Sequence, residues 1–210
     1  MADIRKDYRH AELDETTTGD DPIHFFAKWF AEAHTAEIDD VNAMTLATVD
    51  ADHKPHARIV LLKGIDEKGF VFFTNYNSAK GKQLHINPNA ALVLYWKELE
   101  RQVRVEGIIQ PISKKDSDDY FESRPIGSKL GAWSSPQSEV IIDRSILNKN
   151  EDHYREKFKD IHIPRPAYWG GYQLIPSSIE FWQGRTNRLH DRIIFTLDVD
   201  GKWQKYRLAP

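Results

Sequence analysis

The sequence contains no cysteine among its 210 residues. This absence excludes disulfide bonds, thiolate metal sites and a cysteine nucleophile, and it is compatible with a reducing compartment. The sequence also has no run of about 18 apolar residues that could cross a membrane. The first fifteen residues, MADIRKDYRHAELDE, lack the apolar stretch of a signal peptide. We therefore expect a soluble, cytoplasmic protein that does not associate with membranes.

A strong excess of charge of one sign is absent as well. The chain has 29 basic and 32 acidic side chains, which gives a formal net charge of −3. This balance produces no general attraction for nucleic acid or for anionic lipid. Six Trp, eight Tyr and ten Phe are typical of a well-packed core with aromatic-lined pockets. We find no linker and no internal repeat, so residues 1–210 are expected to form one domain.

Several familiar ligand-binding and catalytic motifs are missing. The sequence has no G-x-G-x-x-G and no G-x-x-x-x-G-K-[ST], so the usual dinucleotide and P-loop cradles are excluded. It also lacks the G-x-S-x-G nucleophile elbow. The nine histidines are scattered without an H-E-x-x-H pattern, and His53 and His56 lie in or beside a predicted turn. No metal site is expected.

The residue pattern predicts one helix near the N-terminus and then mainly strands. Residues 1 to about 20 are polar and lack periodicity, which suggests a mobile arm. A helix is expected from Pro22, with Asp21 as its cap. Short helices are also expected at 78–87 with Ser78 as cap, at 113–124 with Ser113 as cap, and at 151–160. The predicted strands are 43–50, 56–63, 69–75, 90–96, 101–111, 169–176, 177–183, 191–201 and 202–208.

These strands are mostly joined by hairpins, and the helices are few and scattered. This order indicates an α+β fold dominated by an antiparallel barrel.

Three clusters of basic residues suggest anion binding. In GRTNRLHDR, residues 184–192, a chain that is extended from Arg188 onward would place Arg188, His190 and Arg192 on one face. Three such groups repel one another unless an anion lies among them. A solvated turn between two strands is an equally acceptable interpretation of this stretch.

The second cluster is RIVLLK, in which Arg58 and Lys63 bracket an apolar strand. Five residues of separation place the two side chains on opposite faces of a regular strand. They would serve two different anions, or they are strand ends whose side chains reach solvent.

The third cluster is YFESRPIGSKLGAW. Tyr120 and Arg124 are four residues apart and would be neighbours on one helix face. Pro125 should end that helix, and Ser128 would lie near the free N–H groups of the next one, where phosphate can bind. Together the three clusters predict two phosphate sites in an aromatic-rich barrel.

The residues that carry these clusters resemble those of a known family. The matching stretches are RIVLLK, FFTNYNSAKGKQL, ERQVRVEG, YFESRPIGSKLGAWSSPQS, WGGYQLIP, EFWQGRTNRLHDR and the ending RLAP. The chain resembles the pyridoxamine 5'-phosphate oxidase family of flavoproteins over nearly its whole length. The resemblance implies a split β-barrel homodimer with FMN at the subunit interface.

The resemblance also implies residue roles. The positions matching FMN contacts are Arg58, Ile59, Val60, Leu61, Leu62, Lys63, Phe73, Thr74, Lys80, Gln102, Gln137, Ser138, Trp182 and Arg192. The positions matching substrate contacts are Arg5, Tyr8, Lys63, Tyr120, Arg124, Ser128, Arg188, Leu189 and His190. Arg188 and His190 match the catalytic positions beside the flavin. Arg185 matches no ligand contact, so we interpret it as structural.

One position departs from the family pattern. Ala79 stands where the family commonly has an arginine, immediately before the matching Lys80. The FMN phosphate would lose a charge-assisted contact of about 1.5–3 kcal/mol. Lys82, two residues beyond Lys80, is a candidate substitute.

The implied reaction oxidises the C4' carbon of pyridoxamine or pyridoxine 5'-phosphate to pyridoxal 5'-phosphate. A hydride equivalent passes to the flavin, and O2 reoxidises it with release of hydrogen peroxide. Arg188 is a poor proton acceptor at neutral pH, and His190 is the better candidate on pKa alone. The alternatives are another split-barrel flavoprotein, such as a flavin reductase, and a non-catalytic carrier of FMN or pyridoxal phosphate.

Overall fold

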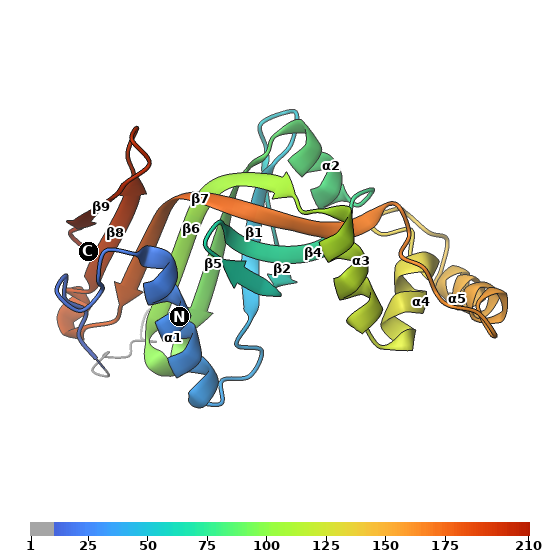
Figure 1. Ribbon diagram of the computed structural model, residues 1–210, viewed down its shortest axis with the longest axis horizontal. Helices are drawn as coiled ribbons and strands as arrows, with labels where there is room; N and C mark the ends of the chain where they lie inside the picture. The colour runs from blue at the N-terminus through green and yellow to red at the C-terminus, as the bar shows by residue number, and fades with distance from the viewer. Residues whose placement is uncertain (1–10) are drawn as a thin grey trace.

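The computed structural model describes residues 11–210 (Figure 1), so the predicted substrate contacts Arg5 and Tyr8 lie outside the described residues. The helices are α1 (Pro22–Thr35), α2 (Ala79–Ile86), α3 (Lys114–Ser123), α4 (Ile126–Ser134) and α5 (Ser145–Lys157), with short 3₁₀ turns η1 (Lys97–Leu99) and η2 (Thr186–Arg188). The strands are β1 (Ala43–Val49), β2 (Pro55–Leu61), β3 (Gly64–Asp66), β4 (Gly69–Asn75), β5 (Asn89–Trp96), β6 (Arg101–Pro111), β7 (Trp169–Gln183), β8 (Asp191–Leu197) and β9 (Trp203–Arg207).

The strands form one antiparallel sheet in the order β2-β1-β5-β6-β7-β4-β3, with β8 paired to β7 and β9 paired to β8. One edge of β7 is shared by two partners. Its first half pairs with β4 over residues 169–174, and its second half pairs with β8 over residues 178–183. This arrangement splits the curled sheet and confirms the predicted fold. Figure 1 shows α3, α4 and α5 at one end of the sheet and β8 with β9 at the other.

The strand β7 corrects one prediction, because residues 169–176 and 177–183 form one strand. Pro176 and the serines that follow it suggested a turn. The structure instead places Pro176 opposite Gly107, at a β-bulge where the register with β6 shifts. A bulge tolerates proline because it interrupts the regular ladder. Gly107 is required here, since an added Cβ would lie 2.0 Å from the carbonyl oxygen of Ile175. The three-residue strand β3 was also not predicted.

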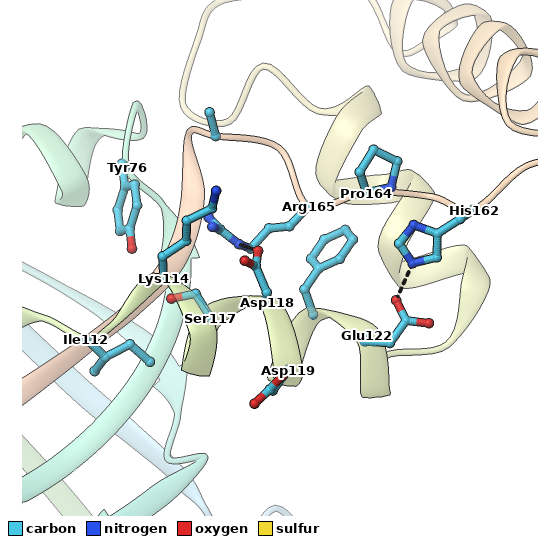
Figure 2. A pocket seen from close by; sticks show the side chains of 12 residues that line it. Tyr76, Ile112, Lys114, Ser117, Asp118, Asp119, Glu122, His162, Pro164 and Arg165 are labelled. Atoms are coloured by element: carbon cyan, nitrogen blue, oxygen red, sulfur yellow. Dashed lines mark hydrogen bonds and ion pairs between the residues drawn. The ribbon is translucent and has the colours of Figure 1, made fainter.

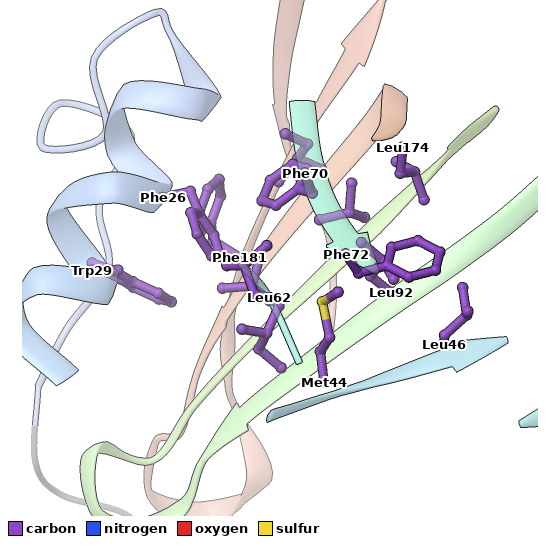
Figure 3. Packing of buried hydrophobic residues seen from close by; sticks show 14 of the residues in the cluster. Phe26, Trp29, Met44, Leu46, Leu62, Phe70, Phe72, Leu92, Leu174 and Phe181 are labelled. Atoms are coloured by element: carbon purple, nitrogen blue, oxygen red, sulfur yellow. The ribbon is translucent and has the colours of Figure 1, made fainter. Parts of the chain in front are cut away.

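The main core lies between α1 and the concave side of the sheet (Figure 3). As predicted, Asp21 caps α1: its side chain accepts hydrogen bonds from the backbone N–H groups of residues 23 and 24. The apolar stripe of α1 then packs on the strands. Phe26 meets Phe70 with ring centroids 4.8 Å apart, and Phe25 meets Phe181 at 4.7 Å. These edge-on contacts between buried rings fix the helix on the sheet.

A second, smaller core belongs to the α3–α5 end of the molecule. Its buried members are Phe121, Leu130, Phe158, Ile163 and Trp169. The predicted caps Ser78 and Ser113 are confirmed, since each accepts a hydrogen bond from a backbone N–H of its own helix. The helix α5 begins at Ser145, six residues before the predicted start.

Residues 11–20 were assigned to a mobile arm, but the structure holds them against β8 and β9. Leu13 is buried, and the Glu15 carboxylate receives two hydrogen bonds from Arg207. The Lys205 ammonium donates to the backbone oxygens of Glu15 and Gly19. These contacts place residues 11–20 beside the last two strands, and the mobility of the arm stays a prediction. Among the described residues, no helix is long and apolar enough to cross a membrane.

Candidate cofactor and substrate site

Arg58 projects from β2 toward the concave side of the sheet, where all its recorded partners are neutral. One guanidinium nitrogen donates to the Thr48 hydroxyl at 2.6 Å and to the Leu46 carbonyl at 3.1 Å. The other donates to the side-chain oxygen of Gln83 in α2 at 3.0 Å. Burial lowers the pKa of Arg58. Arg58 is therefore a partly desolvated cation held in place by neutral groups.

Lys80, in the first turn of α2, lies close enough to Arg58 for the two charges to interact. Its ammonium donates to the Thr74 hydroxyl at 3.3 Å. Burial lowers the pKa of Lys80, and the charge of Arg58 lowers it further. Within residues 11–210, no carboxylate pairs with either cation. Two neighbouring cations without an acid form a site at which a dianion such as phosphate relieves the repulsion.

The position of Ala79 bears on this site. Ala79 is the first residue of α2 and is exposed. Lys82 is also exposed and lies three residues further on, so it is a neighbour of Ala79 on one helix face. Lys82 is two residues from Lys80 and therefore projects in another direction. Lys82 therefore lies beside position 79, where the family commonly has an arginine.

A second group of predicted residues meets beside α3, around Phe73, which is the neighbour of Thr74 in the same strand, β4. The rings of Phe73 and Tyr120 stack with centroids 3.7 Å apart, and Trp169 stacks 5.6 Å from Phe73. The Arg124 guanidinium lies over the Trp169 ring at 4.4 Å. Phe73 comes from β4 and Tyr120 from α3, so the fold brings together residues that are 47 positions apart.

The Arg124 side chain is incompletely satisfied. Its Nη1 atom is buried and has no hydrogen-bond partner among the described residues. Burial lowers the pKa of Arg124 and raises that of Tyr120, whose pKa the Arg124 charge lowers in turn. Buried donors are almost always paired, because leaving one unpaired costs about 1–3 kcal/mol. An anionic ligand is the natural partner for this group.

The helix α4 begins directly beyond Arg124. Pro125 occupies its cap position and provides no side-chain cap, and its first turn holds no acidic residue. Ser128 lies in this turn and is exposed. Uncapped N–H groups at a helix start attract anions. The backbone around Ser128 is therefore suitable for the phosphate binding that the sequence predicts there.

Three further predicted residues lie side by side on neighbouring strands. Gln102 of β6 is opposite Trp182 of β7, and Trp182 is opposite Arg192 of β8. The His190 ring packs on Trp182 with centroids 4.7 Å apart. Arg192 donates to the buried Glu180 carboxylate at 2.8 Å, and this hydrogen bond raises the pKa of Arg192.

The turn before β8 departs from the sequence prediction. The chain is not extended at Arg188, because Asn187 and Arg188 have φ of 55° and 61° within η2. Arg188 therefore does not belong to the alternating face of β8, and the shared face predicted for Arg188, His190 and Arg192 is wrong. Asn187 is the available signal, since asparagine tolerates positive φ better than most residues. Leu189 in the same turn is exposed.

His190 lies at the end of this turn. Its Nδ1 accepts the backbone N–H of Arg185 at 3.1 Å. Burial lowers the pKa of His190, as does the charge of Arg188, whereas Asp191 raises it. Arg185 itself pairs with Glu12 at 2.7 Å, which agrees with the structural role predicted for it.

The predicted FMN residues occupy both faces of the sheet. Arg58 is opposite the fully buried Leu46 on the neighbouring strand. Leu46 is the first of a row of buried cross-strand neighbours, which goes on through Leu92, Val105 and Ile179. Gln102, Trp182 and Arg192 alternate with buried core residues, namely Val103, Phe181 and Ile193. Cross-strand neighbours share a face, and successive residues alternate faces. Arg58 therefore projects from one face, and these three residues project from the other.

The remaining predicted residues are distributed more widely. Ile59 and Leu61 are exposed on the convex face, Val60 faces inward, and Leu62 is buried in the main core. Lys63 follows β2 and lines a cavity of about 440 Å³ beside α1.

Gln137 and Ser138 follow α4 and are exposed, and Ser138 has a φ of 73°. Gln137 lines a different cavity, of about 330 Å³. The structure therefore does not bring Gln137 and Ser138 to Arg58 through any recorded contact.

A further cavity, of about 810 Å³, lies on another side of α3 (Figure 2). None of the predicted site residues lines it. Two ion pairs lie in its lining: Arg165 pairs with Asp118 at 2.7 Å, and His162 with Glu122 at 2.7 Å. No cluster of three potential metal ligands occurs within residues 11–210.

Sequence reasoning missed some residues of both sites. Thr48 and Gln83 fix the Arg58 side chain, and Trp169 supports Arg124. These contacts join residues 10 to 45 positions apart. No local pattern marks such residues, so only the folded arrangement reveals them.

Solved structures identify the class of protein that this fold defines. The protein PhzG from Burkholderia lata, in complex with tetrahydrophenazine-1-carboxylic acid, superposes with a TM-score of 0.91 at 27% identity, covering 98% of this chain and 100% of that one. An FMN-binding protein related to pyridoxamine 5'-phosphate oxidase, from Nostoc punctiforme, superposes with a TM-score of 0.71 at 17% identity, covering 90% and 98%. The fold is that of the flavin-binding split barrels.

Sequence comparison then gives the family. A family model described as pyridoxamine 5'-phosphate oxidase matches residues 30–157, and one described as the pyridoxine 5'-phosphate oxidase C-terminal dimerisation region matches residues 169–210. A pyridoxine/pyridoxamine 5'-phosphate oxidase from Cupriavidus necator is 55% identical over 210 residues, covering 100% of this chain and 99% of the relative. One from Trichormus variabilis is 51% identical, covering 100% and 98%. The chain belongs to the pyridoxamine 5'-phosphate oxidase family.

Proposed function

We propose that the protein is an FMN-dependent oxidase that converts pyridoxamine and pyridoxine 5'-phosphate to pyridoxal 5'-phosphate. Molecular oxygen is the electron acceptor, and hydrogen peroxide is released. The observation that carries this proposal is the buried, unpaired Nη1 of Arg124 beside Tyr120. It supplies a second anion site, apart from Arg58 and Lys80, which a simple flavin reductase does not need.

Arg58 and Lys80 bind the FMN phosphate in this proposal. The two cations lack an acidic partner among the described residues, and Thr48, Thr74 and Gln83 hold them in place. A phosphate dianion compensates both charges. The neutral ribityl and ring parts of a flavin would not, so the site favours FMN over riboflavin.

In this proposal, the predicted contacts to one FMN come from two copies of the chain. Arg58 projects from one face of the sheet, while Gln102, Trp182 and Arg192 project from the opposite face. A single sheet cannot present both faces to one flavin. A homodimer resolves this when each copy offers its convex face to the partner's phosphate site, and the match of residues 169–210 to a dimerisation region supports it.

The substrate phosphate binds Arg124, Tyr120 and Ser128 at the start of α4, together with Lys63. Binding energy gained at this phosphate holds the reacting C4' carbon in place. FMN held by Arg58 and Lys80 would supply the redox chemistry, as acceptor of a hydride equivalent from C4' and donor of the electrons to oxygen. Arg188 orients the substrate and stabilises negative charge. His190, whose pKa is lowered, is largely neutral at pH 7 and able to accept a proton.

The experiment is to load the protein with FMN and add pyridoxamine 5'-phosphate, first without air and then with it. We expect the visible absorbance of the oxidised flavin to bleach without air, and to recover with air as peroxide and the aldehyde product form. Bleaching by NAD(P)H without the amine would identify a flavin reductase. Binding of both ligands without any bleaching would identify a carrier.

A phenazine-related role deserves the same assay, because PhzG shares the fold with a TM-score of 0.91. Its identity to this chain is 27%, against 55% for the relative named pyridoxine/pyridoxamine 5'-phosphate oxidase. We therefore favour the vitamin B6 substrates. Oxidation of tetrahydrophenazine-1-carboxylic acid in preference to pyridoxamine 5'-phosphate would reverse this choice.

A further inference from the structure

The turn between β7 and β8 carries Arg188 and His190 in an unfavourable backbone conformation. Asn187 and Arg188 are consecutive non-glycine residues with positive φ. Such conformations persist only when the surrounding structure enforces them. The contacts that enforce this one therefore decide where Arg188 and His190 project.

Asp191, immediately after the turn, has contacts to three separate parts of the chain. Its Oδ1 accepts a hydrogen bond from Arg207 of β9 at 2.8 Å. Its Oδ2 accepts the backbone N–H of Leu13 at 3.1 Å and lies 3.7 Å from the Arg185 guanidinium. The Asp191 side chain is only 19% exposed, so these contacts are only partly screened by solvent.

Arg207 is itself held from the other side. It donates to both carboxylate oxygens of Glu15, at 2.5 and 2.7 Å, and to the backbone oxygen of Leu13. The hydrogen bonds from Arg207 lower the pKa of Glu15 to about 2, so this carboxylate is charged at neutral pH. The guanidinium thus bridges Glu15 and Asp191 and cannot rotate away without losing both.

Arg185 connects this network to the histidine. Its guanidinium contacts Glu12 and Asp191, while its backbone N–H donates to the Nδ1 of His190. Residues 12–15 therefore act on the turn through both arginines. Both ends of the turn are tied to the same carboxylate.

We propose that Asp191 is a positioning residue, whose carboxylate, held by Arg207, Arg185 and the Leu13 N–H, sets the direction in which the turn presents Arg188 and His190. Segment 12–15 is the strap that keeps this carboxylate in place. The roles of Arg188 and His190 rest on the proposed function, whereas the geometry of the strap does not.

Asp198 provides a matched control on the same hairpin. Its carboxylate also accepts several hydrogen bonds, from the N–H groups of Asp200 and Lys202 and from the side chain of Gln204. These contacts stabilise only the local β8–β9 turn. Asp198→Asn reports what an ordinary loss of hairpin stability does to the enzyme.

The test compares Asp191→Asn with Asp198→Asn in FMN-loaded protein. The measurements are flavin content, kcat and KM for pyridoxamine 5'-phosphate, and the titration of the His190 imidazole by NMR without substrate. The charged groups that act on this imidazole are Arg188 and Asp191, and the Arg185 N–H and the Trp182 ring also contact it. Asparagine keeps the size and a hydrogen-bond acceptor but removes the negative charge.

We expect Asp191→Asn to lower kcat/KM about tenfold, because a small displacement of catalytic groups is costly. The pKa of His190 should fall, since the carboxylate that stabilises the imidazolium is lost. Asp198→Asn should change neither quantity. If the two variants share the same kcat/KM and the same His190 titration, Asp191 has no positioning role.

Glu15→Gln tests the strap if Asp191→Asn does not fold. It weakens the hold on Arg207 from the far side and leaves Asp191 intact. We expect a loss of kcat/KM of a few-fold at unchanged flavin content, and an unchanged kcat/KM would overturn the proposal. If the unmodified protein does not oxidise pyridoxamine 5'-phosphate, the proposed function fails, while the His190 titration still decides the positioning role.

Discussion

The basic side chains at the β8–β9 end of the molecule differ from those of the two candidate phosphate sites near α2 and α3 in what balances their charge. At the β8–β9 end, carboxylates do so: Arg192 pairs with Glu180, and Arg207 pairs with Glu15. These pairs connect strands and hold the N-terminal segment. Their charge is compensated within the chain, so they need no ligand for balance.

In the two candidate phosphate sites near α2 and α3, three basic side chains contact neutral groups instead, namely Arg58, Lys80 and Arg124. Arg58 and Lys80 donate to hydroxyls, an amide and a carbonyl, and Arg124 lies on an aromatic ring with one nitrogen unpaired. Partly buried cations without carboxylates are costly unless an anion binds. The comparison teaches that the presence of a carboxylate partner, rather than the number of basic residues, separates architecture from a ligand site. Arg192 is a predicted ligand contact whose charge a carboxylate already balances.

The largest expected effect follows from removing Arg124. Arg124→Gln should lower kcat/KM for pyridoxamine 5'-phosphate about 100-fold, because a charged hydrogen bond to phosphate is worth about 1.5–3 kcal/mol and the net charge of the site also falls. Flavin content should stay normal. The control is Arg155→Gln, which removes an exposed arginine paired with Glu151. Steady-state kinetics that show equal losses in both variants would contradict the second phosphate site.

Lys80 tests the cofactor half of the comparison. Lys80→Gln should weaken FMN binding about 30-fold, which corresponds to about 2 kcal/mol. The affinity for riboflavin should not change, because riboflavin has no phosphate to lose. Fluorescence titration with both flavins measures this directly. An equal loss for FMN and riboflavin would mean that Lys80 does not contact the phosphate.

Arg188→Lys keeps the charge but removes the planar guanidinium. We expect kcat/KM to fall about tenfold while FMN content remains stoichiometric, since lysine cannot reproduce the two-pronged contact. Arg155→Lys, on the exposed face of α5, is the control. Near-normal kcat/KM in Arg188→Lys would restore the interpretation of residues 184–192 as a solvated turn.

Ala79→Arg adds a third cation to the site of Arg58 and Lys80, where no carboxylate among the described residues balances the charge. FMN should bind more tightly, by up to about tenfold, because each tenfold is about 1.4 kcal/mol. The double variant Ala79→Arg with Lys82→Ala shows whether Lys82 contributes already. An unchanged dissociation constant in Ala79→Arg alone would indicate that Lys82 compensates for the missing arginine.

The smallest effect concerns acid stability at the carboxylate-paired end. The pKa of Glu15 is lowered from 4.5 to about 2, so its pairing stabilises the fold above pH 4.5 and is lost as the pH falls toward 2. Between pH 5 and pH 2, the melting temperature of Glu15→Gln should therefore fall less than that of the unmodified protein. The exposed position limits the difference to a few degrees. Parallel pH profiles would mean that the pair does not contribute.

Much of the fold could be predicted because its signals are local. Alternation of apolar residues marks most strands, and Asp21, Pro22 and Ser78 mark helix starts. The continuity of β7 was missed because Pro176 is a turn signal, and only the pairing with β6 shows that it lies in a bulge.

The candidate site was less predictable than the fold. The shared helix face of Tyr120 and Arg124 is a local property and is confirmed by the contacts around Trp169. The direction of Arg188 depends on backbone strain in η2, which alternation rules ignore. The two faces occupied by Arg58 and Trp182 depend on strand register, which no single stretch of sequence specifies.

The length of β7 has a consequence for subunit stoichiometry. Trp169 at its start stacks with Tyr120, a predicted substrate contact, and Trp182 near its end is a predicted FMN contact. Thirteen residues of strand separate them by roughly 40 Å. In the proposed dimer, the two ends of one β7 therefore serve two different active sites. A mixed dimer of one copy damaged at the Trp169 end and one damaged at the Trp182 end would carry one doubly damaged site and one fully intact site.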